Sequence, residues 1–482
     1  CRTGRVLCID NLETGSLTNI EHIVVLMLEN RSFDHMAGWF GKGDGLRTDL
    51  FNPERLDDPA SPKVFATRDA HYTDDLAIDP SHALLNVNVQ LFGSTTVPQP
   101  ANGENLGFVA DYATQPGQTP AGAKAIMNGF DPARLPVMKT LADEFVLCDR
   151  WFSSVPGQTW PNRFFMHAAT SGGFVDNQFR NYTFKTIYDN LQSAGYPWSI
   201  YFHDMPQTVT MASLRKKEYL THNFKPMAQF HLDLATGNLP AYSFIEPRYF
   251  DFRKWKANDQ HPPHDVALGE HLIADVYEAL RRSSAWETTL FFVLYDEHGG
   301  IYDHVCPPAC SNPDGKLSVN PPFDFTRLGL RVPTLVISPY VQKGVVDSTQ
   351  YDHTSILATV KELFNLPHAL TQRDREANTT SRLLQSTART DAPMTLPRPP
   401  ALAVAMDVPV SGAAVTAADS PVNGAPSQAP LSEFQISLIE TADALSGAHP
   451  VSGVPGAPTQ PTTEHEGAVH VRKALARILL KP

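Results

Sequence analysis

The sequence has little basic charge and no long apolar run. Lys and Arg number 39 against 51 Asp and Glu, so the net charge is −12, which argues against nucleic acid or strongly anionic membranes as partners. The longest apolar runs, near residues 23–28 and 290–295, fall far short of the roughly 18 residues that cross a bilayer. A composition of 42% hydrophobic and 19% charged residues over 482 positions predicts a globular chain with a large core.

Cysteines are also few, five in all, and they leave several interpretations open. Cys306 and Cys310 are close enough for a disulfide loop or a metal knuckle, although two prolines lie between them and no second pair accompanies them. Cys1 and Cys8 could pair, and Cys1 could be a processed, lipidated terminus or an arbitrary boundary. We expect a secreted or periplasmic protein, with a cytoplasmic location left open.

Residues 22–40, HIVVLMLENRSFDHMAGWF, change abruptly from a strand pattern to a helix pattern. Ile23–Leu28 is an unbroken apolar run, typical of a strand buried on both faces of a parallel sheet. The apolar residues of Phe33–Phe40 then repeat at the spacing of one helix face. Glu29 and Asn30 are therefore expected at the C-terminal end of a central strand, where open α/β sheets bind ligands. A capping role for this loop is the alternative.

A second stretch favours a catalytic or ligand-binding role for Glu29 and Asn30 over a helix-capping role. Thr289–Tyr295, TLFFVLY, reads as another fully buried strand, and it ends in Asp296 and Glu297, followed by His298 and two glycines. Two buried strands that are distant in sequence thus each end in adjacent oxygen-bearing side chains. This arrangement is typical of a metal-centred hydrolase at the edge of a sheet.

Thr159 lies just before a predicted helix that starts with Pro161 in its first turn and ends before Gly172. Free backbone N–H groups and the helix dipole favour a bound phosphate or an oxyanion at such an end. An N-cap threonine would produce the same local pattern.

Several histidines occupy loops that precede predicted helices. His82 comes before a short helix near residues 83–91, a position that is more often capping or surface than catalytic. His261 and His264 precede a helix that Asp265 is expected to cap, and this helix leads into the strand at 289–295 as a βαβ crossover.

The pattern predicts an α/β fold with a mostly parallel central sheet flanked by helices on both faces, and with loops of residues 44–130 over the active face. We expect a catalytic domain at 1–387 and an Ala/Pro-rich linker at 388–430. A C-terminal helical segment at 431–482 is expected to dock on the core.

Several motifs, in this order along the chain, resemble the phosphoesterase family of bacterial and plant non-specific phospholipases C and related acid phosphatases, within the alkaline-phosphatase-like superfamily. They are ENRSFDH (29–35), DPSH (79–82), DRWFSSVPGQTWPNR (149–163), HPPHDV (261–266), YDEHGGIYDHV (295–305) and RVPTLVISPYV (331–341), and LSEFQ (431–435) is also similar.

The resemblance implies an alkaline-phosphatase-like fold and a set of site residues. Thr159 matches the nucleophile position, and histidines around the phosphate would act in catalysis. The implied metal ligands are Glu29, Asn30, Thr159, Asp296 and Glu297; the implied catalytic residues are Thr159, His82, His261, His264 and His304; and the implied phosphate-binding residues are Asn30, Asn162 and His298.

The donor chemistry agrees with this assignment. A threonine hydroxyl is a weak nucleophile that needs a metal or a base, and the oxygen-only ligand set suits Mg²⁺, Ca²⁺ or Mn²⁺ better than the two-zinc site of alkaline phosphatases proper. We expect a phospholipase C that releases diacylglycerol through a phospho-threonine intermediate, with phosphatidylcholine-like substrates and transient membrane contact. A broad acid phosphatase with the same site is the alternative, and no nucleic acid or obligate protein partner is expected.

Overall fold

The computed structural model describes residues 19–73, 75–96, 103–252, 255–400, 427–447 and 461–479. Within them, the central feature is an eight-stranded sheet of order β12-β4-β11-β8-β1-β7-β5-β6. All of its strands run in one direction except β11, which is antiparallel to β8 and β4. The predicted mostly parallel sheet is confirmed. Its strands are β1 (His22–Leu28), β4 (Val146–Cys148), β5 (Trp198–Phe202), β6 (Phe224–Pro226), β7 (Tyr242–Glu246), β8 (Thr289–Tyr295), β11 (Thr334–Ile337) and β12 (Val346–Asp347).

Two hairpins lie outside this sheet: β2 (Phe51–Pro53) pairs with β3 (Lys63–Phe65), and β9 (Ser318–Val319) pairs with β10 (Pro322–Phe323).

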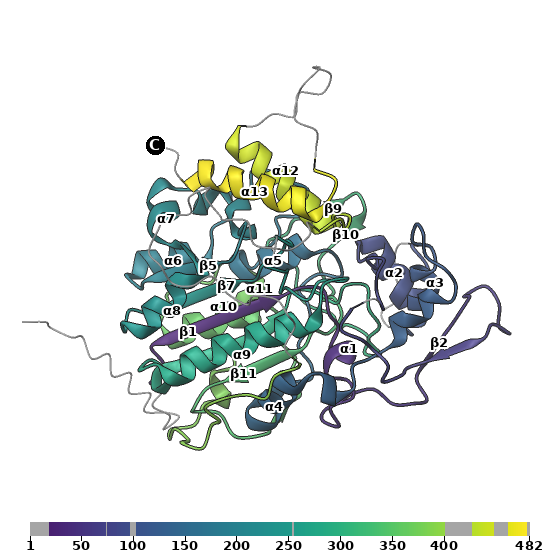
Figure 1. The fold of residues 1–482 in the computed structure, drawn as a ribbon, viewed down its shortest axis with the longest axis horizontal. Helices are drawn as coiled ribbons and strands as arrows, with labels where there is room; N and C mark the ends of the chain where they lie inside the picture. Colours follow the sequence, from purple (N-terminus) through teal and green to yellow (C-terminus); the bar gives the residue numbers. More distant parts are fainter. Residues whose placement is uncertain are drawn as a thin grey trace, which may run out of the picture.

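Helices cover both faces of the sheet, as predicted (Figure 1). One group contains α4, α8 and α9, and α5, α6 and α10 pack against one another as a second group. The helices are α1 (Phe33–Ala37), α2 (Leu84–Phe92), α3 (Phe108–Tyr112), α4 (Pro136–Glu144), α5 (Thr159–Ala168), α6 (Ile187–Ala194), α7 (Lys217–His222), α8 (Met227–Ala235), α9 (Val266–Arg282), α10 (Thr354–Leu363), α11 (Gln372–Glu376), α12 (Glu433–Ser446) and α13 (Glu464–Leu479). In the part of the chain that the structure describes, no helix is long and apolar enough to cross a membrane.

The two predicted central strands are neighbours. Every residue of β8 is buried, as are Ile23–Leu28 of β1, because helices pack on both faces. The strands run parallel with Leu28 opposite Tyr295. Both strands therefore end at the same level of the sheet. The crossover into β8 uses α9, whose N-cap Asp265 accepts the N–H of Ala267 at 2.8 Å, as expected.

Two helix boundaries differ from the sequence prediction. The helix after β1 ends at Ala37 instead of reaching Phe40. Helix α5 begins at Thr159 rather than at Pro161 and ends at Ala168. Thr159 is thus the first residue of a helix, not the residue before it.

The C-terminal helices α12 and α13 pack on the body of the molecule and form its upper edge in Figure 1. The ring of Phe434 on α12 lies edge-on to Tyr249, with ring centroids 4.9 Å apart. The start of the predicted linker runs beside α9, where the carbonyl of Pro393 accepts the Tyr277 hydroxyl at 2.6 Å. Residues 401–426 lie outside the described ranges, so the three-part division of the chain stays a prediction.

Three of the five cysteines lie in the described residues. Cys148, Cys306 and Cys310 are free thiols. The proposed pairing of Cys1 with Cys8, and any lipidation of Cys1, fall outside the described residues.

Candidate active site

The ends of β1 and β8 are joined directly at the edge of the sheet. The backbone N–H of Asn30 donates to Oδ1 of Asp296 at 3.0 Å, and the same oxygen accepts the N–H of Glu297 at 2.8 Å. Asn30 has a left-handed backbone, with φ of 54°, a conformation that asparagine tolerates better than most residues. This turn places the four side chains Glu29, Asn30, Asp296 and Glu297 together.

Glycine is required where the two strand ends meet. Gly299 has φ of 65°, and a Cβ there would collide with the carbonyl oxygen of Asn30. A Cβ at Gly300, which has φ of 70°, would lie 2.6 Å from the carbonyl oxygen of Ser81. The glycine pair therefore lets the loop after β8 approach both the β1 loop and the segment that carries His82.

Arg163 on α5 holds two of the acids. Its guanidinium bonds Oε1 of Glu29 and lies 3.5 Å from Oδ2 of Asp296, and all three side chains are fully buried. Burial raises the pKa of Glu29 well above its usual value and that of Asp296 to about 6, while Arg163 lowers both. Burial lowers the pKa of Arg163, but the two acids outweigh it and leave that pKa raised.

The three strand-end acids each have one buried carboxylate oxygen without a hydrogen bond from any described residue: Oε2 of Glu29, Oδ2 of Asp296 and Oε1 of Glu297. An unpaired buried carboxylate oxygen is costly. Together with the amide oxygen of Asn30, these atoms form an oxygen-rich donor set that fits a hard divalent cation. A positive ion there would lower the pKa of the acids that burial raises. The donor chemistry of these residues therefore suits the expected metal.

Thr159 faces this donor set. Its hydroxyl donates to Oδ1 of Asn30 at 3.5 Å, and its side chain is fully buried. The helix end offers fewer free N–H groups than expected, because the N–H of Trp160 donates to Asn177 at 2.8 Å and Pro161 has none. The hydroxyl of Thr159, rather than the helix end itself, is thus the group presented to the acids.

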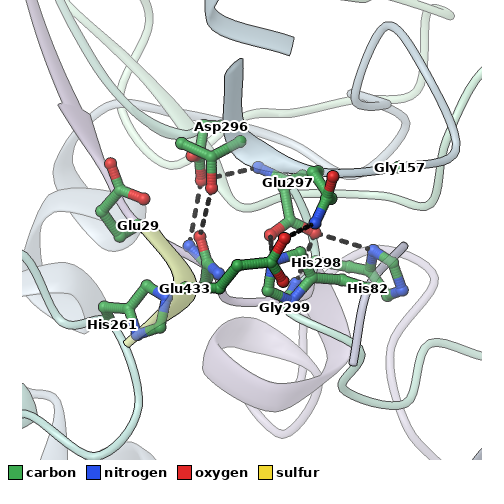
Figure 2. A network of polar contacts seen from close by, with 12 residues as sticks. Glu29, His82, Gly157, His261, Asp296, Glu297, His298, Gly299 and Glu433 are labelled. Atoms are coloured by element: carbon green, nitrogen blue, oxygen red, sulfur yellow. Dashed lines mark hydrogen bonds and ion pairs between the residues drawn. The ribbon is translucent and has the colours of Figure 1, made fainter. Parts of the chain in front are cut away.

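Two of the predicted histidines reach the same place (Figure 2). His82 donates from Nδ1 to the Pro80 carbonyl at 3.0 Å, and its Nε2 lies 3.7 Å from Oε1 of Glu297. His261 donates from Nδ1 to the Pro262 carbonyl at 2.5 Å. No described residue makes a hydrogen bond to Nε2 of either ring.

The charges around these two rings differ. Burial lowers the pKa of His82, but the carboxylates of Glu297 and Asp79 outweigh it and raise that pKa to about 9. Burial and the neighbouring histidines hold the pKa of His261 well below its usual value. The carboxylate of Asp79 lies 3.8 Å from Nε2 of His261, and its own pKa is raised to about 7 by partial burial.

Three predicted site residues have other partners. The ring of His264 is bonded at both nitrogens, to Asp259 at 2.6 Å and to Glu464 at 2.7 Å. The side-chain amide of Asn162 donates to the carbonyls of residues 155, 157 and 158, and its oxygen accepts the N–H of residue 155. His298 contacts Gln90 at 2.9 Å and lies 3.2 Å from Oε2 of Glu297.

These contacts show what each side chain does within the fold. Asn162 holds the loop before Thr159, His298 contacts Glu297, and His264 ties the catalytic body to α13. Their predicted roles in phosphate binding and catalysis stay predictions.

His304 lies in a separate cluster, and its predicted catalytic role stays a prediction. Its ring contacts Asp34 at 2.7 Å and Asp44 at 3.1 Å. The ligand atoms of Asp34, Asp303 and His304 lie within 4.8 Å of one another, so the cluster offers donors for a cation. Arg331 offsets part of the negative charge of this cluster, with bonds to Asp303 at 2.9 Å and Asp34 at 3.0 Å. The cluster therefore combines an ion-pair network with donors for a cation.

Glu433 is a site residue that the sequence did not assign. It is the first residue of α12, and its carboxylate accepts the side-chain amide of Gln158, next to Thr159. Figure 2 shows this carboxylate among the strand-end acids and the histidines. Its charge contributes to the raised pKa of both His82 and Asp79. Because Glu433 is exposed, it marks the mouth of the site.

Arg163 and Asp79 were also missed as site residues. Both lie within the motifs that resemble the phosphoesterase family, which is the signal that could have found them. Glu433 lies in a similar motif near the C-terminus, but nothing local there indicates that it reaches the site.

The sequence profile of the Phosphoesterase family matches residues 20–367. Non-specific phospholipase C1 of Arabidopsis thaliana is 39% identical over 95% of this chain and 86% of its own length. Phospholipase C B of Mycobacterium tuberculosis is 28% identical over 73% of this chain and 75% of its own. A solved structure of a protein in the alkaline phosphatase superfamily from Vibrio parahaemolyticus aligns with a TM-score of 0.32 and 11% identity, over 48% of this chain and 60% of that one.

Proposed function

The chain belongs to the Phosphoesterase family and is a phospholipase C-type phosphoesterase, and on that premise we propose that it cleaves zwitterionic phospholipids through a covalent intermediate on Thr159. One observation carries the proposal. Buried carboxylate oxygens and histidine nitrogens lie around the Thr159 hydroxyl, and they have no hydrogen-bond partner among the described residues. Buried polar atoms without partners are unusual unless a ligand satisfies them.

In the first step, Oγ of Thr159 gives up its proton to solvent and attacks the phosphorus of the lipid phosphodiester. A bond forms between Oγ and phosphorus, and the bond to the diacylglycerol oxygen breaks. His82, with the carboxylate of Glu297 3.7 Å from its Nε2, holds a proton that it delivers to the departing alkoxide. Thr159 then carries the phosphorylated head group.

In the second step, a water attacks the same phosphorus and gives its proton back to the histidine. The bond between phosphorus and Oγ breaks, the phosphorylated head group leaves, and Oγ takes up a proton from solvent, which restores the threonine hydroxyl. His261, whose Nε2 is also without a hydrogen bond from the described residues, faces the phosphoryl oxygens in this arrangement.

Glu29, Asn30, Asp296 and Glu297 would hold a divalent cation, with Mg²⁺, Ca²⁺ or Mn²⁺ favoured by the oxygen donors. When bound, this cation would acidify the Thr159 hydroxyl and neutralise phosphoryl oxygens. Arg163 keeps the carboxylates of Glu29 and Asp296 in place by its buried ion pairs.

A zwitterionic head group is supported by the acidic mouth of the site. The exposed carboxylate of Glu433 lies among the strand-end acids and histidines, and the half-buried carboxylate of Asp79 lies 3.8 Å from Nε2 of His261. A choline or ethanolamine cation is attracted there, whereas phosphatidylserine and phosphoinositides add negative charge. The net charge of −12 acts in the same direction.

A secreted or periplasmic location, where such lipids are accessible from outside the cell, completes the proposal.

A substrate panel tests the function. Purified enzyme is assayed with phosphatidylcholine, sphingomyelin and p-nitrophenyl phosphate, with diacylglycerol, ceramide and nitrophenol as the measured products. We expect diacylglycerol from phosphatidylcholine at the highest kcat/KM. Hydrolysis of p-nitrophenyl phosphate without any lipid cleavage would favour the acid phosphatase alternative.

A further inference from the structure

The most exposed large apolar side chains of the described residues lie on a hairpin. Val319 on β9 is 85% exposed, and Leu317, just before it, is 61% exposed. Single exposed apolar residues are common on protein surfaces. A group of them beside a functional site indicates an interaction surface, so the position of this hairpin matters.

The hairpin is packed against the segments that form the active site. Phe323 on β10 contacts a small hydrophobic cluster that contains Leu84 of α2 and Val155 of the loop before Thr159. Arg327, after the hairpin, donates to Oδ1 of Asn88 on α2 at 3.3 Å. The hairpin therefore borders the start of α2, two residues beyond His82.

Two further exposed apolar residues lie on the neighbouring segments. Leu85, 41% exposed, is the second residue of α2. Ile436, 45% exposed, is on α12, and it shares a helix face with Glu433, three residues earlier. Since Glu433 bonds Gln158 beside the nucleophile, Ile436 lies one turn away from the mouth of the site.

The loop at residues 172–177 links α12 and the hairpin. Asn177 donates its N–H to Oε1 of Gln158 at 3.2 Å, and Gln158 in turn bonds Glu433. Gly173 lies against the hairpin, where a Cβ would be 3.1 Å from the carbonyl oxygen of Leu317. The hairpin, α2 and α12 are thus connected through the segments that carry the site, and Figure 1 shows β9 and β10 between α2 and the start of α12.

We propose that Leu85, Leu317, Val319 and Ile436, here called the rim surface, form the face with which the protein docks on a zwitterionic phospholipid bilayer. The proposal rests on the phospholipase C activity, because the substrate of such an enzyme is held in a bilayer. Apolar side chains on three separate segments enter the boundary between head groups and acyl chains. With a net charge of −12, the protein is not attracted to an anionic membrane surface, so binding depends on this apolar contact.

When the rim surface is docked on the bilayer, a lipid reaches the active site without leaving the membrane. Apolar side chains are exposed on the hairpin, α2 and α12, and the carboxylate of Glu433 lies among the strand-end acids and histidines. The acyl chains stay in the bilayer, and the phosphodiester and its cationic head group reach the polar centre. The rim surface therefore contributes to the turnover of lipid held in a bilayer and has no part in the chemical step.

The test compares bilayer and dispersed substrate. In Leu317→Ser/Val319→Ser, both side chains are largely exposed, so the fold is retained, and the melting temperature verifies this. Leu232→Ser is the matched control, because Leu232 is similarly exposed at 42% but lies on α8, which Figure 1 places away from the hairpin. Binding is measured by flotation with phosphatidylcholine vesicles, and turnover with the same vesicles and with short-chain phosphatidylcholine below its micellar concentration.

We expect the hairpin variant to lose about tenfold in vesicle binding and in vesicle turnover, with unchanged turnover of the dispersed lipid and a control equal to wild type. Ile436→Ser, from another segment, should show a smaller loss of the same kind. Wild-type vesicle binding by the hairpin variant would overturn the proposal, as would an equal loss on dispersed lipid. A change of oligomeric mass with normal vesicle binding would instead identify a second copy as the occupant. If wild-type enzyme binds vesicles but hydrolyses no lipid, the proposed function fails and the docking surface stands.

Discussion

The backbone N–H of Asn30 donates to Oδ1 of Asp296 across 3.0 Å, although 266 positions separate the two residues in sequence. This bond joins the ends of two parallel strands that are in register. Oδ2 of Asp296 has no hydrogen bond from the described residues, and the side-chain oxygen of the same Asn30 accepts the Thr159 hydroxyl at 3.5 Å. The geometry of the proposed metal and nucleophile site follows from this single connection.

Removal of divalent cations is expected to abolish activity and to lower the melting temperature, since three buried carboxylate oxygens would then lack a partner. Elemental analysis before and after chelation, with thermal melts in Mg²⁺, Ca²⁺ or Mn²⁺, measures both effects. In Glu29→Gln, the stabilisation by added cation should weaken. Full turnover by a demonstrably metal-free sample would assign Glu29, Asp296 and Glu297 to acid–base or hydrogen-bonding roles.

Arg163→Met should destabilise the protein by about 3–5 kcal/mol, because it leaves two buried acids without their ion pair. Urea unfolding measures the change, and added divalent cation should recover part of it. Arg47→Met is the control: Arg47 pairs with Asp49 at 3.3 Å on the surface, and its loss should cost at most about 1 kcal/mol. Equal stability of the two variants would contradict this account of Arg163.

His264 is expected to make the docking of α13 sensitive to pH. Burial lowers its pKa, but the carboxylates of Asp259 and Glu464 outweigh this effect and hold that pKa well above the usual 6.5. A raised folded-state pKa gives a stabilisation that is complete below the unfolded value and disappears as the pH rises through the folded value. Burial raises the pKa of Asp259. Burial also acts to raise the pKa of Glu464, but the bond to His264 outweighs it and leaves that pKa lowered.

The check is the difference in unfolding free energy between wild type and His264→Gln from about pH 6 to about pH 10. It should be largest at the acidic end of this range and shrink toward the alkaline end. A difference that grows with pH would show that the ring is bonded in its neutral form.

Glu433→Gln should reduce the preference for phosphatidylcholine over phosphatidylglycerol by about fivefold, the effect of about 1 kcal/mol from one exposed charge. The ratio of kcat/KM values for the two lipids in identical vesicles measures it. Glu440→Gln, an exposed acid later on α12, should leave the ratio unchanged. If both substitutions shift the ratio equally, overall charge rather than the mouth of the site decides lipid preference.

The central strands could be predicted from the sequence because burial on both faces leaves a direct signal in it. Ile23–Leu28 and Thr289–Tyr295 are continuous apolar runs that end in acids, and parallel neighbours bring such ends together. The antiparallel direction of β11 could not be predicted in this way, since an apolar run does not encode the direction of its strand.

Side-chain orientation was the main limit at the site. His261 and His264 lie on one loop, yet the first faces the acids and the second bridges Asp259 to Glu464. The two histidines have different partners because of tertiary packing, which the local sequence does not show. Glu433 reaches Gln158 from 275 positions away, through a contact that depends on where α12 docks and has no local pattern.

The most direct test of the central claim is to trap the covalent intermediate. Enzyme turning over phosphatidylcholine is quenched in acid, digested and analysed by mass spectrometry for the peptide that contains Thr159. We predict a phosphorylated head group on Thr159. We also predict that Thr159→Ala carries none, that it loses at least about 10³-fold in turnover, and that it keeps its unfolding free energy within about 1 kcal/mol. Near-normal hydrolysis by a folded Thr159→Ala enzyme, with no modified threonine in wild type, would contradict the account.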